Sequence, residues 1–312
     1  MRVAAIDQGT NTTRLLIADV DGDELEEVAR RVEITRLGEG VDARRRLLPV
    51  PITRVRNVLT DYRREAEALG AVRILLVATS AVRDAENGEA FLGEIEWSFG
   101  FVTRLLTGDE EAELTFRGAA DNRIGSTLVV DPGGGSTEFV VGENGRVRFR
   151  QSVDIGSVRL TERFVHSDPP TADELSAAAA FVRASLPPPP EADQAVGVAG
   201  TFTTLAALDM GLGEPEGFGT DGHRLTPGAV RALRERLASL PLADRRRLPG
   251  LHPKRAPVIV AGAVLVEQVL ASYDLEAIEV SERDILHGTA FEAATLPAPA
   301  EEAAPPGAYT CC

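Results

Sequence analysis

The sequence predicts an α/β protein of two related domains, because one pattern of strands and turn occurs twice in its 312 residues. Residues 3–20 read VAAIDQGTNTTRLLIADV, and residues 128–142 read LVVDPGGGSTEFVVG. Each copy is an apolar strand that ends near an aspartate, then a tight turn of small residues, then a second apolar strand. We therefore expect two domains of common origin, each opening with a β-hairpin whose turn can bind an anion.

The rest of the first half continues as strands and helices. Residues 25–34 predict a third strand that completes a meander with the first hairpin. Apolar residues at helical spacing predict a helix that has Pro51 in its first turn and ends at Gly70. Residues 74–78 are a continuous apolar run, which is typical of a buried strand. Residues 110–120 predict a helix that could link the two halves.

The second half is also α/β. Residues 147–153 supply its third strand, and the Thr171–Glu174 capping box opens a helix that runs to Ser185. The four prolines that follow predict a surface connection. The remaining predicted elements are a helix opened by Thr226 and Pro227, a long helix opened by Ala256 and Pro257 that ends near Ser272, a strand at 278–280 and a helix at 284–294.

The composition limits the classes of function. The formal net charge of −15 argues against general affinity for nucleic acid or for anionic membranes. No apolar run approaches the roughly 18 residues that a membrane-spanning helix needs, and we expect no signal peptide. The only cysteines are Cys311 and Cys312, so no disulfide framework is expected and a cytoplasmic location is the default. Residues 296–312 are rich in Pro, Ala and Glu and predict a disordered tail, with a lipidation or metal-binding role for the cysteine pair as the alternative.

The second turn has the composition of a phosphate-binding loop. Glycines allow close approach of an anion and let several N–H groups converge, while hydroxyls add donors. Asp131, at the end of the preceding strand, is placed to bind Mg²⁺. A plain hairpin turn is the alternative, but two residues suffice for such a turn, and the layout occurs twice. The candidate phosphate ligands are Gly9, Thr10, Asn11 and Thr12 in the first loop and Gly133, Gly134, Gly135, Ser136 and Thr137 in the second.

Three further charged positions allow more than one interpretation. Acidic residues 109–113 could simply favour the positive end of a helix dipole. Arg83 follows a buried strand and could donate two parallel hydrogen bonds to a phosphate, or it could pair with Asp84 or Glu86. Glu138 follows the second loop and could be functional or merely solvated. The four histidines show no metal-ligand spacing, so we expect each of them in a loop or at the surface.

Over residues 1–295 the chain resembles the Ppx/GppA phosphatases. The resemblance rests on the two turn motifs and on seven further blocks in the family's order: RLGEGV (36–41), ATSAVRDAENG (78–88), LTGDEEAELTFRGA (106–119), VDIGSVRLTERF (153–164), GVAGTFTTLAAL (197–208), PGLHPKRA (249–256) and SERDILHG (281–288). It implies two duplicated ribonuclease-H-like (actin-like ATPase) domains with an active site in the cleft between them. The domains expected are 1–119, completed by helix 284–295, and 120–283, followed by the tail 296–312.

The resemblance also implies roles for single residues. Glu111 matches the catalytic glutamate in the pattern Gly-x-Glu-Glu-Ala, and Glu138 matches a carboxylate that assists the metal or the water. Arg83 resembles a phosphate-contacting arginine, and Asp131 and Asp7 are the candidate metal ligands. The cofactor implied is Mg²⁺, with Mn²⁺ as an alternative and a monovalent cation such as K⁺ as an addition. Family members often form homodimers.

The chain departs from the family at several positions. Gln8 and Pro132 stand where small apolar residues are usual, Thr10 stands for serine, and His287 stands for an acid. Pro132 removes one backbone donor from the second loop. The Gly197–Thr201 turn occupies the adenosine-binding position of the kinase relatives, and here a role in fold or in binding a substrate tail is favoured.

The predicted function is therefore an exopolyphosphatase that releases terminal orthophosphate by Mg²⁺-assisted attack of water. Hydrolysis of guanosine pentaphosphate (pppGpp) is the alternative, and an ATP-dependent kinase or ATPase and a non-catalytic phosphate sensor are more remote ones. A kinase would need a purine pocket, and a sensor would be expected to lose Glu111, Asp131 or the loop glycines. Short chains are the expected substrate because of the acidic net charge, although arginines at 44–46, 63–64 and 245–247 could form a basic track.

Overall fold

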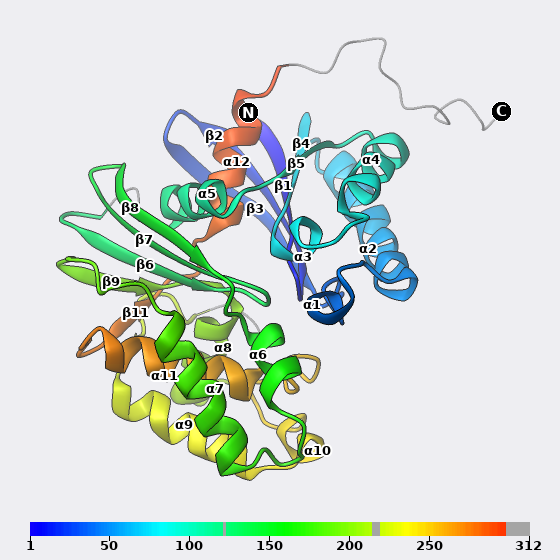
Figure 1. The fold of residues 1–312 in the computed structure, drawn as a ribbon. Helices are drawn as coiled ribbons and strands as arrows, with labels where there is room; N and C mark the ends of the chain where they lie inside the picture. Colours follow the sequence, from blue (N-terminus) through cyan, green and yellow to red (C-terminus); the bar gives the residue numbers. More distant parts are fainter. Residues whose placement is uncertain (121–122, 214–218, 298–312) are drawn as a thin grey trace. The chain divides into compact units, whose positions relative to one another are not determined.

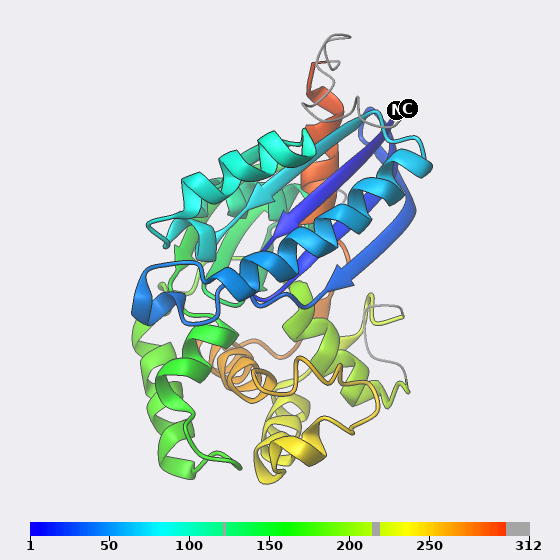
Figure 2. The same ribbon diagram turned by 90° about the vertical axis from the view of Figure 1, so that its right-hand side faces the viewer.

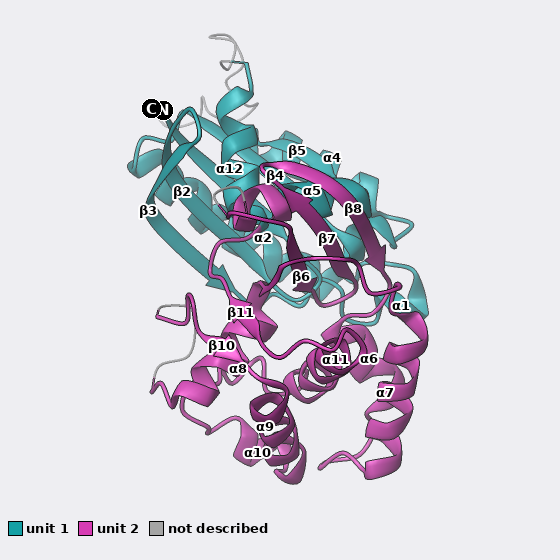
Figure 3. Ribbon diagram, turned by 90° about the vertical axis from the view of Figure 1, so that its left-hand side faces the viewer, with its two compact units in different colours: residues 1–114, 285–312 teal, residues 115–284 magenta. Residues whose placement is uncertain are grey.

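The computed structural model describes residues 1–120, 123–213 and 219–297, and it divides into two compact units (Figures 1 and 3). Unit 1 comprises residues 1–114 and the described chain from Ile285 onward, and unit 2 comprises residues 115–284. The division falls inside helix α5 (Gly108–Ala120), whereas the sequence analysis set the domain limit after residue 119.

Unit 1 contains a mixed five-stranded sheet in the order β3-β2-β1-β4-β5. The first three strands form an antiparallel meander, and the last two run parallel to β1. Both faces of β1 are covered, which explains why its sequence is an apolar run rather than an alternation. The strands are β1 (Arg2–Gln8), β2 (Thr13–Asp21), β3 (Glu24–Glu33), β4 (Arg73–Ala78) and β5 (Val102–Leu105).

Helices cover the two faces of this sheet with different side chains of β1. Ala4 and Ile6 pack with α2 (Pro49–Ala68) and α4 (Gly88–Phe99), which lie over one face in Figure 2. Val3 and Ala5 face the opposite way and pack with α12 (Ile285–Thr295). Short helices α1 (Val41–Arg44) and α3 (Ser80–Arg83) complete the unit together with the first turns of α5.

Unit 2 contains a mixed six-stranded sheet in the order β10-β11-β9-β6-β7-β8. Strands β6, β7 and β8 form an antiparallel meander, β9 and β11 run parallel to β6, and β10 pairs antiparallel at the edge. The strands are β6 (Thr127–Pro132), β7 (Thr137–Glu143), β8 (Arg146–Val153), β9 (Gln194–Gly197), β10 (Arg224–Leu225) and β11 (Ile278–Val280).

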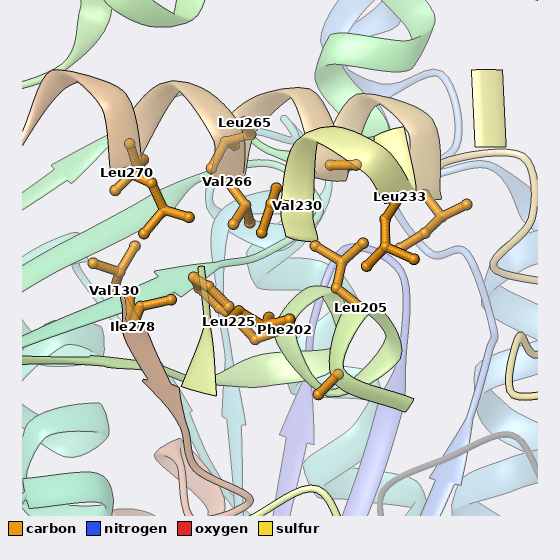
Figure 4. Packing of buried hydrophobic residues seen from close by; sticks show 14 of the residues in the cluster. Val130, Phe202, Leu205, Leu225, Val230, Leu233, Leu265, Val266, Leu270 and Ile278 are labelled. Carbon is orange, nitrogen blue, oxygen red and sulfur yellow. The ribbon is translucent and has the colours of Figure 1, made fainter. Parts of the chain in front are cut away.

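The core of unit 2 is built around α11 (Ile259–Ser272), which is apolar on nearly every side and buried. Figure 4 shows Leu265, Val266 and Leu270 of this helix beside leucines, valines and Phe202 from neighbouring helices and strands. The other helices are α6 (Ser157–Phe164), α7 (Ala172–Ser185), α8 (Ala199–Met210), α9 (Pro227–Ser239) and the short α10 (Leu242–Arg245).

The two sheets share one topology. Without the edge strand β10, the order β8-β7-β6-β9-β11 repeats the order β3-β2-β1-β4-β5, with the same strand directions. Three antiparallel strands followed by two parallel ones form a ribonuclease-H-like sheet. The predicted fold class, α/β with this sheet duplicated, is confirmed.

Most predicted elements are present, with limits that shift by a few residues. The capping box at Thr171 and Glu174 is confirmed, and the long helix α11 begins at Ile259, two residues after the proline that was expected to open it. The elements that were not predicted are helices α1, α3, α4, α6, α8 and α10 and strands β5, β9 and β10. No helix within the described residues is long and apolar enough to cross a membrane. Residues 298–312, with Cys311 and Cys312, lie outside the described chain.

One prediction about histidine was wrong. His287 lies inside helix α12 and is only 1% exposed, so it is neither in a loop nor at the surface. Its ring can be buried because Nε2 lies 2.8 Å from Oε1 of Glu27 on β3, which satisfies the polar atom. The residue that replaces the usual acid is therefore part of the packing between α12 and the sheet of unit 1.

Candidate phosphate-binding site

The loop between β6 and β7 has its carbonyl oxygens tied to the start of helix α6. The N–H of Ser157 donates to the carbonyl of Gly133 at 3.0 Å, and the N–H groups of Val158 and Arg159 donate to that of Gly134 at 2.9 and 3.1 Å. The carbonyl of Gly135 accepts from the Arg159 side chain, through Nε at 2.8 Å. Three successive loop carbonyls are thus held on one element.

These bonds fix the opposite ends of the same peptide groups. In a planar trans peptide the C=O and the following N–H point in opposite directions. Holding the carbonyls of residues 133–135 therefore turns the N–H groups of Gly134, Gly135 and Ser136 away from α6. Within the described chain these three N–H groups donate no hydrogen bond. Consecutive N–H groups of this kind form an anion-binding nest.

The first loop, between β1 and β2, is built in the same way. Gly38 and Arg36 donate backbone N–H groups to the carbonyls of Thr10 and Asn11 at 2.8 and 2.9 Å. The carbonyl of Gly9 accepts from Nε2 of Gln8 at 3.1 Å. The N–H groups of residues 10–12 are correspondingly turned outward, and none of them has a hydrogen-bond partner among the residues described. Each unit therefore carries one nest of three backbone donors, within the two loops that the sequence singled out. Three of the candidate ligands have donors that are bonded within the protein: the N–H of Gly9 donates to the carbonyl of Thr12, that of Gly133 to the carbonyl of Asp131, and the Thr137 hydroxyl to the carbonyl of Ile155.

The two hairpins differ in the side chains that stand opposite the aspartates. Asp131 pairs across the strands with Glu138, so two carboxylates lie on the same face of the hairpin, 6% and 1% exposed. In unit 1, Asp7 pairs with Arg14, whose Nε and Nη2 donate to Oδ2 at 2.9 and 2.7 Å. The charge of Asp7 is thus balanced within the protein by an arginine.

The two carboxylates of the second hairpin, Asp131 and Glu138, suit a hard divalent cation. Like charges placed directly opposite repel one another, and a cation removes that cost. Thr115 Oγ1 donates to Asp131 Oδ2 at 3.2 Å and Ser152 Oγ donates to Glu138 Oε1 at 2.7 Å, so both carboxylates are oriented. Across the described ranges, no group of three or more His, Cys, Asp or Glu side chains could hold a metal. Phosphate oxygens and water would therefore have to supply the remaining ligands.

The acidic residues at the start of α5 have separate environments. Glu110 belongs to a capping box: its carboxylate accepts from the N–H and hydroxyl of Thr107, which accepts in return from the N–H of Glu110. The bond from the Thr107 N–H is the main reason that the pKa of Glu110 lies below its usual value. Asp109 and Glu113 are exposed, whereas Glu111 is only 7% exposed. Glu111 therefore cannot be a solvated charge at a helix end.

Glu111 is held by Arg83 within unit 1. Arg83 Nη1 donates to the carbonyl of Leu106 at 2.7 Å and to Glu111 Oε2 at 3.2 Å. Arg83 ends helix α3, which begins with Ser80, and the Ser80 hydroxyl lies 2.9 Å from that of Thr10 in the first loop. A chain of neighbouring residues within one unit therefore links the first nest to Arg83 and Glu111.

The departures from the family pattern have local explanations. Pro132 lies in β6, opposite Thr137, and precedes the three outward N–H groups, so its missing donor does not reduce the nest. The carbonyl of Pro132 accepts from Thr201 Oγ1 at 3.3 Å, which ties the Gly197–Thr201 turn to the second loop. Gly197 is packed against the ring of Phe202, where a Cβ would lie 2.6 Å away. These contacts support a structural role for this turn.

Four residues whose side chains orient the candidate site were not predicted from the sequence. They are Thr115 and Ser152, which orient the carboxylates, and Gln8 and Arg159, which hold loop carbonyls. Arg159 lies in the block VDIGSVRLTERF, which the resemblance includes without assigning roles. Only the buried hydrogen bonds reveal what these side chains do.

The fold and these loops define a two-unit α/β protein in which each ribonuclease-H-like unit carries a nest of three outward backbone N–H groups. The family model for the Ppx/GppA phosphatase family matches residues 16–295. The chain belongs to that family.

Comparisons with single proteins agree. Exopolyphosphatase 2 of Mycobacterium tuberculosis is 42% identical in an alignment that covers 94% of this chain and 98% of the relative. The crystal structure of an exopolyphosphatase-like protein matches with a TM-score of 0.88 at 34% identity, covering 94% of this chain and 98% of that one. The Ppx/GppA family member of Aquifex aeolicus matches with a TM-score of 0.76 at 32% identity, covering 92% and 95%.

Proposed function

We propose that this protein is an exopolyphosphatase, which hydrolyses the terminal phosphoanhydride bond of inorganic polyphosphate. The observation that carries the proposal is the pair of nests, each with three outward backbone N–H groups. A phosphoryl group bears its charge on several oxygens, and successive N–H donors suit that distribution. The 42% identity to a protein named exopolyphosphatase over nearly the whole chain supports the same substrate class.

In the proposed reaction, the oxygen of a water molecule forms a bond to the terminal phosphorus. The bond from that phosphorus to the bridging oxygen breaks, and the shortened chain leaves on that oxygen. Glu111 orients the water and accepts its proton, since it is a buried carboxylate with one oxygen held by Arg83. The nests bind phosphoryl oxygens, and Arg83 adds a cationic donor.

We further propose that Asp131 and Glu138 hold a divalent cation, with Mg²⁺ as the preferred ion. Carboxylate oxygens suit Mg²⁺, which usually binds one or two carboxylates together with phosphate and water. When bound, such an ion neutralises charge on the phosphate oxygens. Asp7 is the weaker candidate ligand of the two aspartates, because Arg14 already balances its charge.

Short polyphosphates are the proposed substrates. A long polyanion needs a cationic track beyond the loops. Four of the eight arginines that could form one have carboxylate partners: Arg63 with Glu67, Arg64 with Asp61, Arg247 with Asp244, and the buried Arg245 with Asp168. The exposed arginines at 44–46 remain candidates for such a track. The net charge of −15 also disfavours long-range attraction of a polyanion.

A phosphate-release assay tests the function. Tripolyphosphate, polyphosphates of roughly ten and of several hundred units, pppGpp and ATP are supplied in turn with Mg²⁺ at two ionic strengths. We expect the highest kcat/KM for the short polyphosphates and weak dependence on salt, because few counterions are released. Preference for pppGpp would replace the proposed substrate. A steady rise toward long chains, with a steep fall in salt, would contradict the short-chain preference alone.

Two glutamine variants test the role of Glu111. Glu111→Gln should lower kcat by roughly 10²- to 10⁴-fold, the usual contribution of a general base, and leave KM nearly unchanged. Glu113→Gln is the matched control, because Glu113 lies on the same helix but is exposed. A Glu111→Gln protein with more than a tenth of the wild-type kcat would remove Glu111 from the catalytic role.

A further inference from the structure

The carbonyls behind the two nests are held in two different ways. Those of Thr10, Asn11, Gly133 and Gly134 accept from backbone N–H groups, which only a substitution by proline would remove. Those of Gly9 and Gly135 accept from side chains, Gln8 Nε2 at 3.1 Å and Arg159 Nε at 2.8 Å. The orientation of one peptide group in each loop therefore depends on a single residue.

Each of these peptide groups carries one of the outward N–H donors. The carbonyl of Gly9 belongs to the peptide whose N–H is that of Thr10, and the carbonyl of Gly135 to the peptide whose N–H is that of Ser136. Glycine offers little steric resistance to rotation of the adjoining peptide. Without its side-chain partner, such a peptide can turn over and present a carbonyl oxygen to the anion in place of an N–H.

The side chains of Gln8 and Arg159 are themselves buried and held in place. Gln8 is fully buried, and its Oε1 accepts from the hydroxyl of Thr13 at 2.8 Å, which in turn lies 2.9 Å from that of Thr35. Arg159 is 8% exposed and lies in the first turns of α6, whose backbone holds the neighbouring loop carbonyls. A buried polar donor aimed at a loop carbonyl gives a reason for glutamine at position 8, where the family usually has a small apolar residue.

We propose that Gln8 and Arg159 are positioning residues for phosphate: each fixes one loop peptide so that its N–H, and not its carbonyl, faces the anion. This inference deepens the proposed function and rests on it for its kinetic consequences. Binding of inorganic phosphate tests it separately, because binding needs the oriented N–H groups and no hydrolysis.

Arg159→Met and Arg159→Lys test the second loop. Methionine keeps much of the side-chain length but has no donor, whereas lysine restores a donor near the carbonyl of Gly135. A hydrogen bond to a charged group contributes enough that its loss weakens binding roughly tenfold to a hundredfold. We expect that loss of inorganic phosphate affinity, by calorimetry, for Arg159→Met, and at least partial recovery for Arg159→Lys. kcat/KM for tripolyphosphate should follow the same order.

Arg245→Met is the matched control for a buried arginine. Arg245 is 3% exposed, and it bonds the carbonyls of Leu240 and Ala256 and the carboxylate of Asp168 instead of the loop. We expect this variant to lower the unfolding temperature and to leave phosphate affinity unchanged at a temperature well below unfolding. Equal loss of affinity in both methionine variants would show a general effect on the fold and would overturn the proposal.

Gln8→Met and Gln8→Glu test the first loop. Both remove the donor to the carbonyl of Gly9, and the glutamate keeps the acceptor for Thr13. We expect phosphate affinity to fall roughly tenfold or more in both. Thr35→Val is the control, because it breaks the neighbouring hydroxyl pair and leaves the bond to Gly9 in place.

The outcomes separate this proposal from the proposed function. Weaker phosphate binding in the donor-less variants supports the positioning role even if the wild-type protein hydrolyses no polyphosphate, a result that would refute only the function. Wild-type phosphate affinity in properly folded Gln8→Met and Arg159→Met proteins overturns the positioning role, whatever the substrate.

Discussion

Replacement of Gly156 by alanine should damage phosphate binding through a steric clash with the second loop. Gly156 precedes helix α6 at φ −146°, a backbone conformation that alanine adopts without strain, so only the added methyl group matters. That Cβ would lie 2.3 Å from the carbonyl oxygen of Gly134, 2.4 Å from its carbonyl carbon and 2.6 Å from the N of Gly135. All three are backbone atoms, so no side-chain rotation can relieve the contact.

The size of the effect follows from these distances. Carbon contacts are optimal near 3.5–4.0 Å, so the loop and α6 must move apart by roughly 1 Å. Overpacking of this kind costs about 1–3 kcal/mol of stability, and a misplacement of about 1 Å can cost roughly 10²-fold in rate. We expect a lower denaturation midpoint and a fall in kcat/KM for tripolyphosphate of about a hundredfold.

Gly93→Ala provides the control. Gly93 is exposed in helix α4, and a Cβ there would meet nothing within 4 Å. This variant should be more stable by up to about 1 kcal/mol, because alanine is the better helix former, with unchanged kinetics. Phosphate release is measured for both variants well below their unfolding temperatures. A Gly156→Ala protein with wild-type KM, kcat and midpoint would refute the close approach of α6 to the loop.

Two more predictions follow from single carboxylates. Asp131→Asn should raise the Mg²⁺ concentration needed for half-maximal phosphate release, because an amide is a poorer ligand than a carboxylate for a hard cation; an unchanged Mg²⁺ titration at full activity would place the metal elsewhere. Glu174 accepts hydrogen bonds from the backbone N–H groups of Thr171, His166 and Ser167, and the first of these contributes most to lowering its pKa to about 2. Because the pKa of Glu174 is lower in the folded than in the unfolded state, its carboxylate stabilises the fold fully above the usual pKa of 4.5, and this stabilisation is lost as the pH falls toward 2. The difference in urea midpoint between wild type and Glu174→Gln should therefore shrink between pH 6 and pH 3. A constant difference would contradict this prediction.

The sequence alone determined the duplicated architecture. The aspartate and the small-residue turn after an apolar strand occur twice, and such local patterns depend on neighbours in the chain, where glycine content and apolar runs are direct signals. It also located the loop residues, and both loops have the outward N–H groups that the glycine and hydroxyl composition indicated. Helices α4, α6 and α8 were missed: α4 carries an internal glycine and several aromatic residues, α6 has only eight residues, and α8 is buried over most of its surface, so it shows no amphipathic period.

Only the tertiary structure decided which charged and polar residues surround the loops. Four acids stand together at the start of α5 in the sequence, but burial and the contact with Arg83 distinguish Glu111 from the others. The carboxylate opposite Asp131 and the arginine opposite Asp7 are set by strand register. His287 can be buried because its ring lies beside Glu27 of β3, a residue 260 positions away in the sequence. Gln8 and Arg159 act through hydrogen bonds to backbone carbonyls. A carbonyl is common to every residue, so its partner leaves no trace in the sequence and is set by the packing of the folded chain.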